Sequence, residues 1–200
     1  MALIKGKAAK NVLQGMRNKA AGEHFENMII EALRYYAREG TAIITKTPEP
    51  MRPIKSLGNG KFIAHYTKKA QVDFSGTFFT GRAIRFEAKH TDTDRFTRDR
   101  LTEEQMEDLR KHHEMGAYCA VMICFGLDHV YRIPWIIWEN MKLVFGRNYI
   151  TEEDVKNFEV ETEITGLKAI LKYTKEEPCG VFGSTHAEGG TTWQAMTITD

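Results

Sequence analysis

The run from Ala117 to Phe125 limits the possible folds most strongly, because every residue in it is apolar. A strand with one face in water alternates apolar and polar side chains. An uninterrupted apolar run of this length is instead typical of a central strand that is covered on both faces. It is also far too short to cross a bilayer, which takes about 20 residues. The sequence therefore predicts an α/β domain whose central sheet is flanked by helices.

The rest of the chain supplies the other elements of such a domain. Apolar residues recur at three- and four-residue steps from Gly22 to Glu39, which predicts a helix that ends at Gly40. Further predicted strands lie at 41–46, 71–78, 82–89 and 128–133, with helices at 103–115, after Pro134 and from Thr151. Residues 158–173 resemble strand material interrupted by Gly166.

Three segments are expected to stand apart from this core. The basic residues 1–17 show little pattern and are predicted to form a flexible arm. Residues 48–69 are rich in proline, glycine and basic residues, and such long connections are often functional, so we predict a stalk that projects from the domain. Residues 178–200 are rich in Gly, Ser and Thr and are predicted to be a flexible tail, which leaves 1–177 as the domain.

A second constraint is the stretch from Gln71 to Lys89, which is predicted to form two strands joined by a three-residue turn ending in Gly81. One register gives a fully apolar face and pairs Val72 with Ala88, Phe74 with Phe86, and Gly76 with Ile84. Because side chains alternate between faces, the other face carries Gln71, Asp73, Ser75, Arg85, Glu87 and Lys89. A shift of one residue would separate the carboxylates and destroy the apolar match.

In this register Asp73 lies directly opposite Glu87, and like charges at such positions destabilise a sheet. One way to offset the repulsion is a divalent cation held by the carboxylate oxygens, with Lys89 on the same face to position water or stabilise charge on a phosphate. The alternative is a solvated ion-pair cluster in which Arg85 and Lys89 neutralise the two acids. Spacing alone leaves both interpretations open.

Charge is distributed very unevenly along the chain. Residues 1–100 hold 19 Lys and Arg against 10 Asp and Glu, or +9, whereas residues 101–200 hold 9 against 17, or −8. A basic half is the electrostatic footprint expected of a protein that binds nucleic-acid phosphates. An uneven but merely solvated surface is the alternative.

Composition excludes several other classes. No apolar segment is long enough for a membrane span or a secretory signal, so a cytoplasmic location and no membrane partner are expected. The three cysteines, Cys119, Cys124 and Cys179, form no CxxC pair. We therefore expect reduced thiols and no zinc site. His112 and His113 are adjacent on a predicted helix and cannot share a face, which argues against a metal pair there.

An ordered set of motifs resembles the RecU family of Holliday junction resolvases, in the PD-(D/E)xK nuclease superfamily. The resemblance runs from Asn18 to Trp138. Its parts are Asn18-x3-Gly22-x2-Phe25-Glu26, Tyr35-Tyr36, Thr45-Lys-Thr-Pro48, Asp73-Phe-Ser-Gly, Arg85-Phe-Glu87-Ala-Lys89 and Leu101-Thr-Glu-Glu-Gln105. It implies a restriction-endonuclease-like mixed sheet with a projecting stalk, and a homodimer that cuts four-way DNA junctions with Mg²⁺, for which Mn²⁺ can substitute.

Carried onto this chain, the resemblance implies that Asp73 and Glu87 are metal ligands and that Lys89 is the catalytic lysine. It places Gln105 near the metal, although Thr102-x-x-Gln105 is also a capping box. Glu26 corresponds to an acidic catalytic residue on the first helix, and its alternative is a solvated helix carboxylate. Gln71 stands where the family commonly has threonine, and its amide oxygen is a candidate ligand.

Departures from the family pattern are typical of a divergent member, such as one carried by a phage. The interval from Asp73 to Glu87 is one residue longer, the stalk is shorter, and the tail has no counterpart. Residues predicted to contact DNA are Lys46, Arg52, Lys55, Lys61, Lys68, Lys69, Arg85, Arg95 and Arg98. For the arginines at 95, 98 and 100, the alternative is pairing with the nearby Asp92, Asp94 and Asp99.

Together these observations favour a magnesium-dependent endonuclease that resolves four-way DNA junctions by paired phosphodiester hydrolysis, with a recombinase as a further candidate partner. One alternative is a PD-(D/E)xK endonuclease that acts on other duplex or branched DNA. The other is a non-catalytic DNA-binding recombination factor. Trp135 and Trp138 are expected to be buried in the core or against a partner subunit.

Overall fold

The computed structural model describes residues 2–67, 71–126 and 129–160, which lie within one of the two units into which the chain divides, residues 1–170. The predicted tail at 178–200, most of the predicted strand material at 158–173, and Cys179 lie outside the described residues. The elements are α1 (Ala2–Arg38), β1 (Ala42–Lys46), β2 (Met51–Gly58), β3 (Lys61–Tyr66), β4 (Phe74–Phe78), β5 (Ala83–Thr91), β6 (Arg95–Thr97), η1 (Arg98–Arg100), α2 (Glu103–Glu114), β7 (Tyr118–Phe125), β8 (His129–Pro134), α3 (Trp135–Glu139), α4 (Met141–Phe145), β9 (Tyr149–Thr151) and η2 (Glu153–Phe158).

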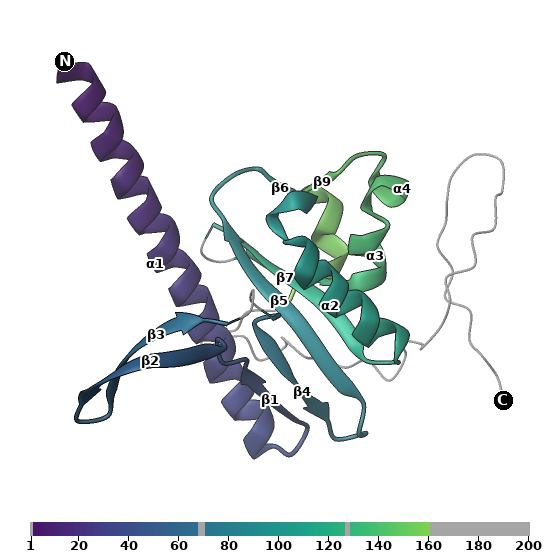
Figure 1. The fold of residues 1–200 in the computed structure, drawn as a ribbon. Helices are drawn as coiled ribbons and strands as arrows, with labels where there is room; N and C mark the ends of the chain where they lie inside the picture. The colour runs from purple at the N-terminus through teal and green to yellow at the C-terminus, as the bar shows by residue number, and fades with distance from the viewer. Residues whose placement is uncertain (1, 68–70, 127–128, 161–200) are drawn as a thin grey trace, which may run out of the picture. The chain divides into compact units, whose positions relative to one another are not determined.

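Five strands form the central sheet in the order β1-β4-β5-β7-β8 (Figure 1). Only β5 and β7 pair in parallel, and the other neighbours are antiparallel, so the sheet is mixed. A parallel pair needs a long crossover connection, and α2 lies in the segment that joins β5 to β7. The α/β fold with a mixed central sheet flanked by helices is confirmed.

Strand β7 occupies the predicted central position, and all eight of its residues are buried. Its odd-numbered residues, such as Val121, share one core cluster with α2 and α3. Trp135 and Trp138 are fully buried in that cluster, which confirms the first of the two predicted environments. By alternation, Ala120 and Met122 point to the opposite face, on which α1 lies (Figure 1).

Helix α1 packs on the sheet through one stripe of its C-terminal half. Phe25, Ile29, Leu33 and Tyr36 recur at steps of three and four residues and are all buried, as an amphipathic surface helix requires. The helix ends at the predicted place, where Gly40 adopts a φ of 66°. Helix α1 makes contacts with β1 and β5, so it covers the sheet beside the predicted carboxylates.

The N-terminal expectation was wrong, because α1 begins at Ala2 and includes the segment predicted to be a flexible arm. Residues 14–20 are exposed, so no buried apolar stripe marks this part of the helix. The segment contains no proline, and Ala and Lys, which are strong helix formers, are its commonest residues. Helical propensity therefore continues the helix where apolar periodicity gives no signal.

The stalk prediction is met by a regular two-stranded hairpin, β2–β3, rather than by an irregular connection. Every residue from Met51 to Tyr66 is exposed, and the hairpin extends away from the central sheet (Figure 1). The turn is formed by Asn59 and Gly60, both with positive φ. Both faces of the hairpin are therefore in contact with solvent.

The predicted register of β4 and β5 is confirmed from Phe74↔Phe86 to Thr77↔Ala83. The rings of Phe74 and Phe86 stack with centroids 4.9 Å apart. Gly81 takes a φ of 85° in the predicted left-handed turn position. The ladder begins at Phe74, so Asp73 lies one residue before β4 rather than inside it.

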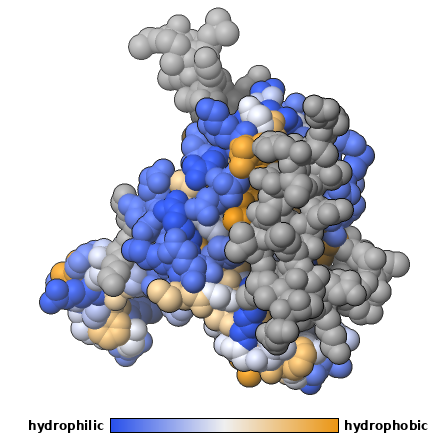
Figure 2. Space-filling view, turned by 90° about the vertical axis from the view of Figure 1, so that its right-hand side faces the viewer, coloured by the Kyte–Doolittle hydropathy of each residue, from blue (hydrophilic) through white to orange (hydrophobic). Residues whose placement is uncertain are grey.

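Among the described residues, no helix is both long and apolar enough to cross a membrane. The coloured part of the surface in Figure 2 is mainly hydrophilic, with separate hydrophobic spots. Cys119 and Cys124 are buried free thiols, as expected for the two cysteines of the apolar run.

The tight approach of β1 to β4 generates a prediction at Gly76. A Cβ at this position would lie 2.1 Å from the Ile43 carbonyl oxygen and 2.5 Å from the Ile44 Cα. Because both atoms belong to the backbone, the strand pair would have to shift to admit it. Gly76→Ala should lower the free energy of unfolding by about 1–3 kcal/mol in urea denaturation. The exposed neighbour provides the control: Thr77→Ala should change it by less than about 1 kcal/mol. Equal stability of the two variants would contradict this packing.

Candidate metal centre

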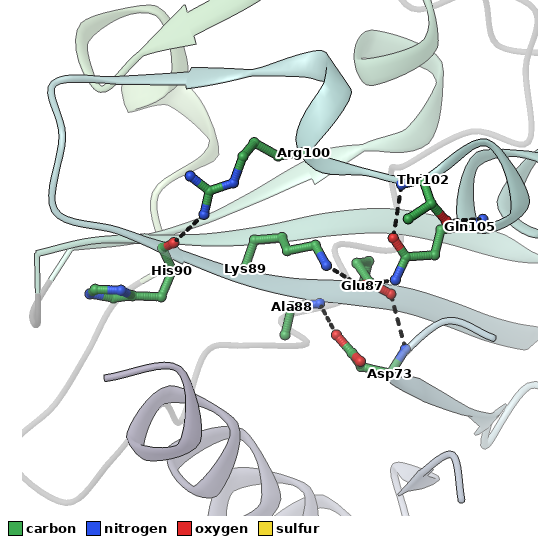
Figure 3. Close-up of polar contacts among 8 residues, drawn as sticks. All are labelled: Asp73, Glu87, Ala88, Lys89, His90, Arg100, Thr102 and Gln105. Carbon is green, nitrogen blue, oxygen red and sulfur yellow. Dashed lines mark hydrogen bonds and ion pairs between the residues drawn. The ribbon is translucent and has the colours of Figure 1, made fainter. Parts of the chain in front are cut away.

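The three residues at the proposed reaction centre are brought together by β5 and by the entry to β4 (Figure 3). Glu87 and Lys89 are two residues apart on β5, so their side chains lie on one face. Asp73 precedes β4, and its backbone carbonyl accepts a hydrogen bond of 2.7 Å from the Thr47 N–H, just after β1. The residue after β1 therefore holds the Asp73 backbone, although Asp73 itself lies outside the ladder of β4 and β5.

Glu87 is completely buried, and both of its carboxylate oxygens have donors. Oε1 lies 2.6 Å from Lys89 Nζ and also accepts a hydrogen bond from Gln105 Nε2. Oε2 accepts a hydrogen bond of 3.2 Å from the Asp73 backbone N–H. A buried carboxylate is tolerated only with such partners, so the surroundings of Glu87 hold it in one orientation.

Asp73 is partly buried and lies against the same segment of β5. Its Oδ2 accepts a hydrogen bond of 2.9 Å from the Ala88 backbone N–H. Each carboxylate thus accepts a hydrogen bond from the backbone of the opposite segment. Glu87 accepts from the N–H of Asp73, and Asp73 accepts from the N–H of Ala88, the residue after Glu87. This arrangement replaces the ladder pairing that the sequence predicted for Asp73 and Glu87, and it keeps both acids in one small polar region (Figure 3).

The raised pKa values of Asp73 and Glu87 show that the surroundings supply too little positive charge to balance two carboxylates. Burial, followed by the negative charge of Asp73, raises the pKa of Glu87 to about 8, and the Lys89 ammonium only partly opposes this. Burial is also the main reason that the pKa of Asp73 is raised, and the Glu26 carboxylate adds to the effect. Two adjacent carboxyl groups that resist ionisation are stabilised in their charged form by a bound cation.

Gln105 combines the two alternatives that the sequence left open. Its Oε1 accepts a hydrogen bond of 3.0 Å from the Thr102 N–H, and its own N–H donates to Thr102 Oγ1 at 3.3 Å, which completes the capping box of α2. Because the cap fixes the amide orientation, the Nε2 group points to Glu87. In this arrangement Gln105 presents a donor to the carboxylates, not the oxygen that a metal ligand would supply.

Glu26 and Lys46 lie beside this centre and form an ion pair with each other. The pair joins α1 to the end of β1, and the hydrogen bond from Lys46 to Glu26 is the largest cause of the raised pKa of Lys46. Both charges act on Asp73, although neither side chain bonds to it directly in the structure. Glu26 is therefore near the predicted site but is engaged with a lysine.

The other predicted site residues are dispersed. Gln71 is exposed, and none of the described contacts joins it to either carboxylate. Arg52, Lys55 and Lys61 lie on the exposed hairpin, and Lys68 and Lys69 lie outside the described residues.

The arginines of this group differ in their partners. Arg85 pairs with Asp108 of α2 at 2.5 Å. Arg95 pairs with Asp94 at 3.6 Å, as the alternative interpretation proposed, and its guanidinium also lies over the Tyr149 ring. The side chain of Arg98 is partly buried, and its Nε has no hydrogen-bond partner. Arg100 donates to the His90 carbonyl oxygen (Figure 3).

Some members of the site were not predicted from sequence. Asp108 holds Arg85, and the Ala88 and Thr47 backbone N–H groups hold Asp73. Asp108 follows Gln105 by three residues and so lies on the same side of α2, which is a signal that could have identified it once the helix was assigned to this face. The backbone contacts have no sequence signal.

The residues fit a divalent cation that prefers hard oxygen ligands. Asp73 and Glu87 supply two carboxylates whose raised pKa values mark a deficit of positive charge. No cluster of three or more His, Cys, Asp or Glu suited to a metal occurs in residues 2–67, 71–126 and 129–160. The remaining ligands would therefore be backbone or amide oxygens, water, or the oxygens of a bound phosphate.

Sequence comparison relates the chain to one family of known proteins. The sequence profile of the family described as RecU, Recombination protein U, matches residues 20–176. The Holliday junction resolvase RecU of Bacillus pumilus is 32% identical over 146 residues, which cover 67% of this chain and 69% of that protein. The Staphylococcus epidermidis protein of the same name is 25% identical over 175 residues, covering 78% and 82%. Among solved structures, the Hjc Holliday junction resolvase of Archaeoglobus fulgidus is similar over 70% of this chain and 90% of its own, with 13% identity and a TM-score of 0.42.

The raised pKa of Glu87 predicts how stability depends on pH in the absence of metal. The folded-state value of about 8 lies above the ordinary value of 4.5, so the stabilising contribution is complete below about pH 4.5 and is lost as the pH rises to about 8. The loss is at most about 1.4 kcal/mol for each pH unit. In urea denaturation with EDTA, the wild type should therefore lose stability relative to Glu87→Gln between pH 5 and 8. Glu31→Gln, an exposed acid on α1, is the control and should follow the wild type. Parallel curves for wild type and Glu87→Gln would contradict the predicted shift.

Proposed function

The chain belongs to the RecU family, and from this premise we propose that it is a metal-dependent endonuclease that resolves four-way DNA junctions by paired phosphodiester hydrolysis. The observation that carries the proposal is the pair formed by partly buried Asp73 and fully buried Glu87, with Lys89 on the same face. Such a pair fits a divalent cation, and the basic half of the chain fits a polyanionic substrate. Branched DNA is the substrate that the family relationship supports.

The proposed chemistry assigns a role to each of the three residues. Asp73 and Glu87 would hold Mg²⁺, with Mn²⁺ as a substitute. When bound, the cation supplies positive charge that polarises the phosphodiester and acidifies water. Hydrolysis forms a bond between a water oxygen and phosphorus, and the bond from phosphorus to one sugar oxygen breaks.

Lys89 is well placed to orient the attacking water or to stabilise negative charge on the phosphate. Its Nζ is held against Glu87 Oε1, and its side chain is partly exposed, so the ammonium can be reached from solvent while remaining at the carboxylates. Gln105 keeps the Glu87 carboxylate in place through its Nε2 group. We propose that Gln105 acts as a positioning residue and that Glu26 acts on the site through its charge.

The hairpin supports the preference for branched DNA because it is attached directly beside the candidate centre. The Thr47 N–H bonds to Asp73, and the Pro50 carbonyl oxygen accepts from the Thr67 N–H at the base of the hairpin. Only two residues separate Thr47 from Pro50. A projection so close to the cutting site can engage a branch point while a strand of the same DNA reaches Asp73 and Glu87.

Paired incision requires two reaction centres, and a twofold homodimer provides them symmetrically. We therefore propose a homodimer acting on a four-way junction in the cytoplasm. A recombinase remains a predicted partner, and we assign it no binding surface among the described residues.

Cleavage of defined substrates tests the proposal. Purified protein should cut a labelled four-way junction with Mg²⁺ or Mn²⁺, should fail to cut it in EDTA, and should cut a linear duplex of the same sequence much more slowly. Asp73→Asn should reduce junction cleavage at least about a hundredfold, because it removes a ligand of the cation whose positive charge stabilises the transition state. It should still bind the junction, because the basic contacts lie elsewhere.

Glu31→Gln is the matched control, since it removes the same charge from an exposed position on α1, and it should cut like the wild type. Binding of the wild type without cleavage in either metal would overturn the proposed activity and favour a non-catalytic DNA-binding factor. Equal cleavage of duplex and junction would overturn the substrate preference alone.

A further inference from the structure

Three arginines follow β5, and the structure sets Arg100 apart from the other two. Arg95 forms an ion pair with Asp94, and the Nε of Arg98 is buried. Arg100 is exposed and forms no ion pair with another described residue. The three aspartates of this segment each contact a different side chain: Asp92 the His90 ring, Asp94 the Arg95 guanidinium, and Asp99 the Thr97 hydroxyl. Arg100 is therefore a positive charge that a ligand can use.

The guanidinium of Arg100 is fixed on two sides although the residue is exposed. Its Nη2 donates a hydrogen bond of 3.2 Å to the His90 carbonyl oxygen, and its Cζ lies 5.0 Å from the centroid of the Phe96 ring. Phe96 is itself buried and packs against Trp138. A guanidinium has five N–H donors, so these contacts orient the group and leave most of its donors for a ligand.

The anchor places this charge beside the candidate metal centre. His90 directly follows Lys89 on β5, so the guanidinium is held one strand residue beyond the lysine. Figure 3 shows that the Lys89 ammonium points to Glu87, whereas the Arg100 guanidinium lies at His90. None of the described contacts joins Arg100 to Asp73 or Glu87. Arg100 is thus next to the centre without being part of it.

The backbone of Arg100 belongs to the segment that also holds one of the carboxylates. Leu101 follows it and is almost fully buried. Thr102 is the N-cap of α2, and its capping box fixes Gln105, which donates to Glu87. Only Leu101 separates Arg100 from this cap. The guanidinium and the Glu87 carboxylate are therefore held at a set spacing by one short, well-anchored stretch of chain.

The ligand that suits this arrangement carries one anionic group at the cation and a second one beside it. Consecutive phosphates of a DNA strand have that form, because each backbone linkage carries a negative charge. When one phosphate lies at Asp73 and Glu87, its neighbours on the same strand pass close to the centre. Arginine grips a phosphate with two parallel N–H bonds and so fixes its place, which the point charge of a lysine does less well.

We propose that Arg100 binds the phosphate next to the one that is cut, on the same strand, and thereby sets which phosphate reaches Asp73 and Glu87. The inference rests on the proposed function for its substrate and adds a positioning residue to it. Lys89 acts on the reacting phosphate, and Arg100 holds the strand in register.

Neutralisation of single phosphates tests the contact. Cleavage with Mg²⁺ first maps the cut phosphate, and a set of junctions then carries one uncharged methylphosphonate at that position or at either neighbour. Binding is measured in EDTA, so that nothing is cut. For the wild type, the change at one neighbouring position should weaken binding about tenfold, because it removes charge-assisted hydrogen bonds. In Arg100→Gln the same change should have almost no effect, because the contact is already lost.

Two further measurements separate this role from a purely structural one. In Arg100→Gln the slope of log affinity against log salt should fall by about 0.9, the value for one phosphate contact. Its cleavage should also spread to phosphates beside the wild-type position. Arg100→Lys keeps the charge and should stay sensitive to the same methylphosphonate. A residue that only stabilised the fold would lower the unfolding temperature and weaken binding of every junction alike.

Arg38→Gln is the matched control, because it removes an exposed arginine at the end of α1. It should keep the wild-type response to every methylphosphonate and the wild-type cut position.

Two results would overturn the proposal. One is an Arg100→Gln protein that responds like the wild type at both neighbouring phosphates. The other is a lost response at the cut phosphate itself, which would place Arg100 on the reacting group. The nuclease proposal fails separately, if the wild type makes no cut with Mg²⁺ or Mn²⁺. A scan of every phosphate near the branch point would then decide the contact: one phosphate that depends on Arg100 supports it, and none overturns it.

Discussion

The repulsion between the fully buried carboxyl group of Glu87 and the partly buried one of Asp73 is the constraint on which the rest of the site depends. Glu87 has no exposed surface, and burial beside Asp73 raises its pKa to about 8. A single lysine, Lys89, offsets part of this cost. A fold keeps such an arrangement only when surrounding structure holds it, and here α2, β5 and Thr47, the residue after β1, all contribute bonds to the two acidic residues. The deficit of positive charge that remains is what a divalent cation and a DNA phosphate bound to it would resolve.

Helix α2 is the element that connects this site to the stability of the domain. Its capping box fixes the Gln105 amide, and the same amide donates to Glu87, so the helix start and the carboxylate cannot move independently. One turn later, Asp108 holds Arg85 on the same face of β5. The apolar side of α2 packs through Met106 and Leu109 into the core behind β7. The polar tie and the apolar contact therefore position the helix from two sides.

Sequence patterns predicted the parts of this structure that depend on local periodicity. The register around Phe74↔Phe86 followed from apolar alternation, and the central position of β7 followed from its apolar run. The start of α1 was missed because its first half has no apolar stripe. The hairpin had a usable signal in Asn59-Gly60, a pair that favours a two-residue turn. Pairs between distant elements, such as Glu26 with Lys46, depend on tertiary packing and have no counterpart in local sequence.

Proton release on metal binding tests the central claim most directly. If Asp73 and Glu87 hold the cation, the largely protonated Glu87 must ionise when the cation binds, because ligands bind metals in their deprotonated form. Calorimetric titration of the protein with Mg²⁺ at pH 7, repeated in buffers of different ionisation enthalpy, should show about one proton released per cation bound. Glu87→Gln should bind more weakly and release almost none. Binding without proton release by the wild type, or equal release by both proteins, would show that the pair Asp73 and Glu87 is not the metal site.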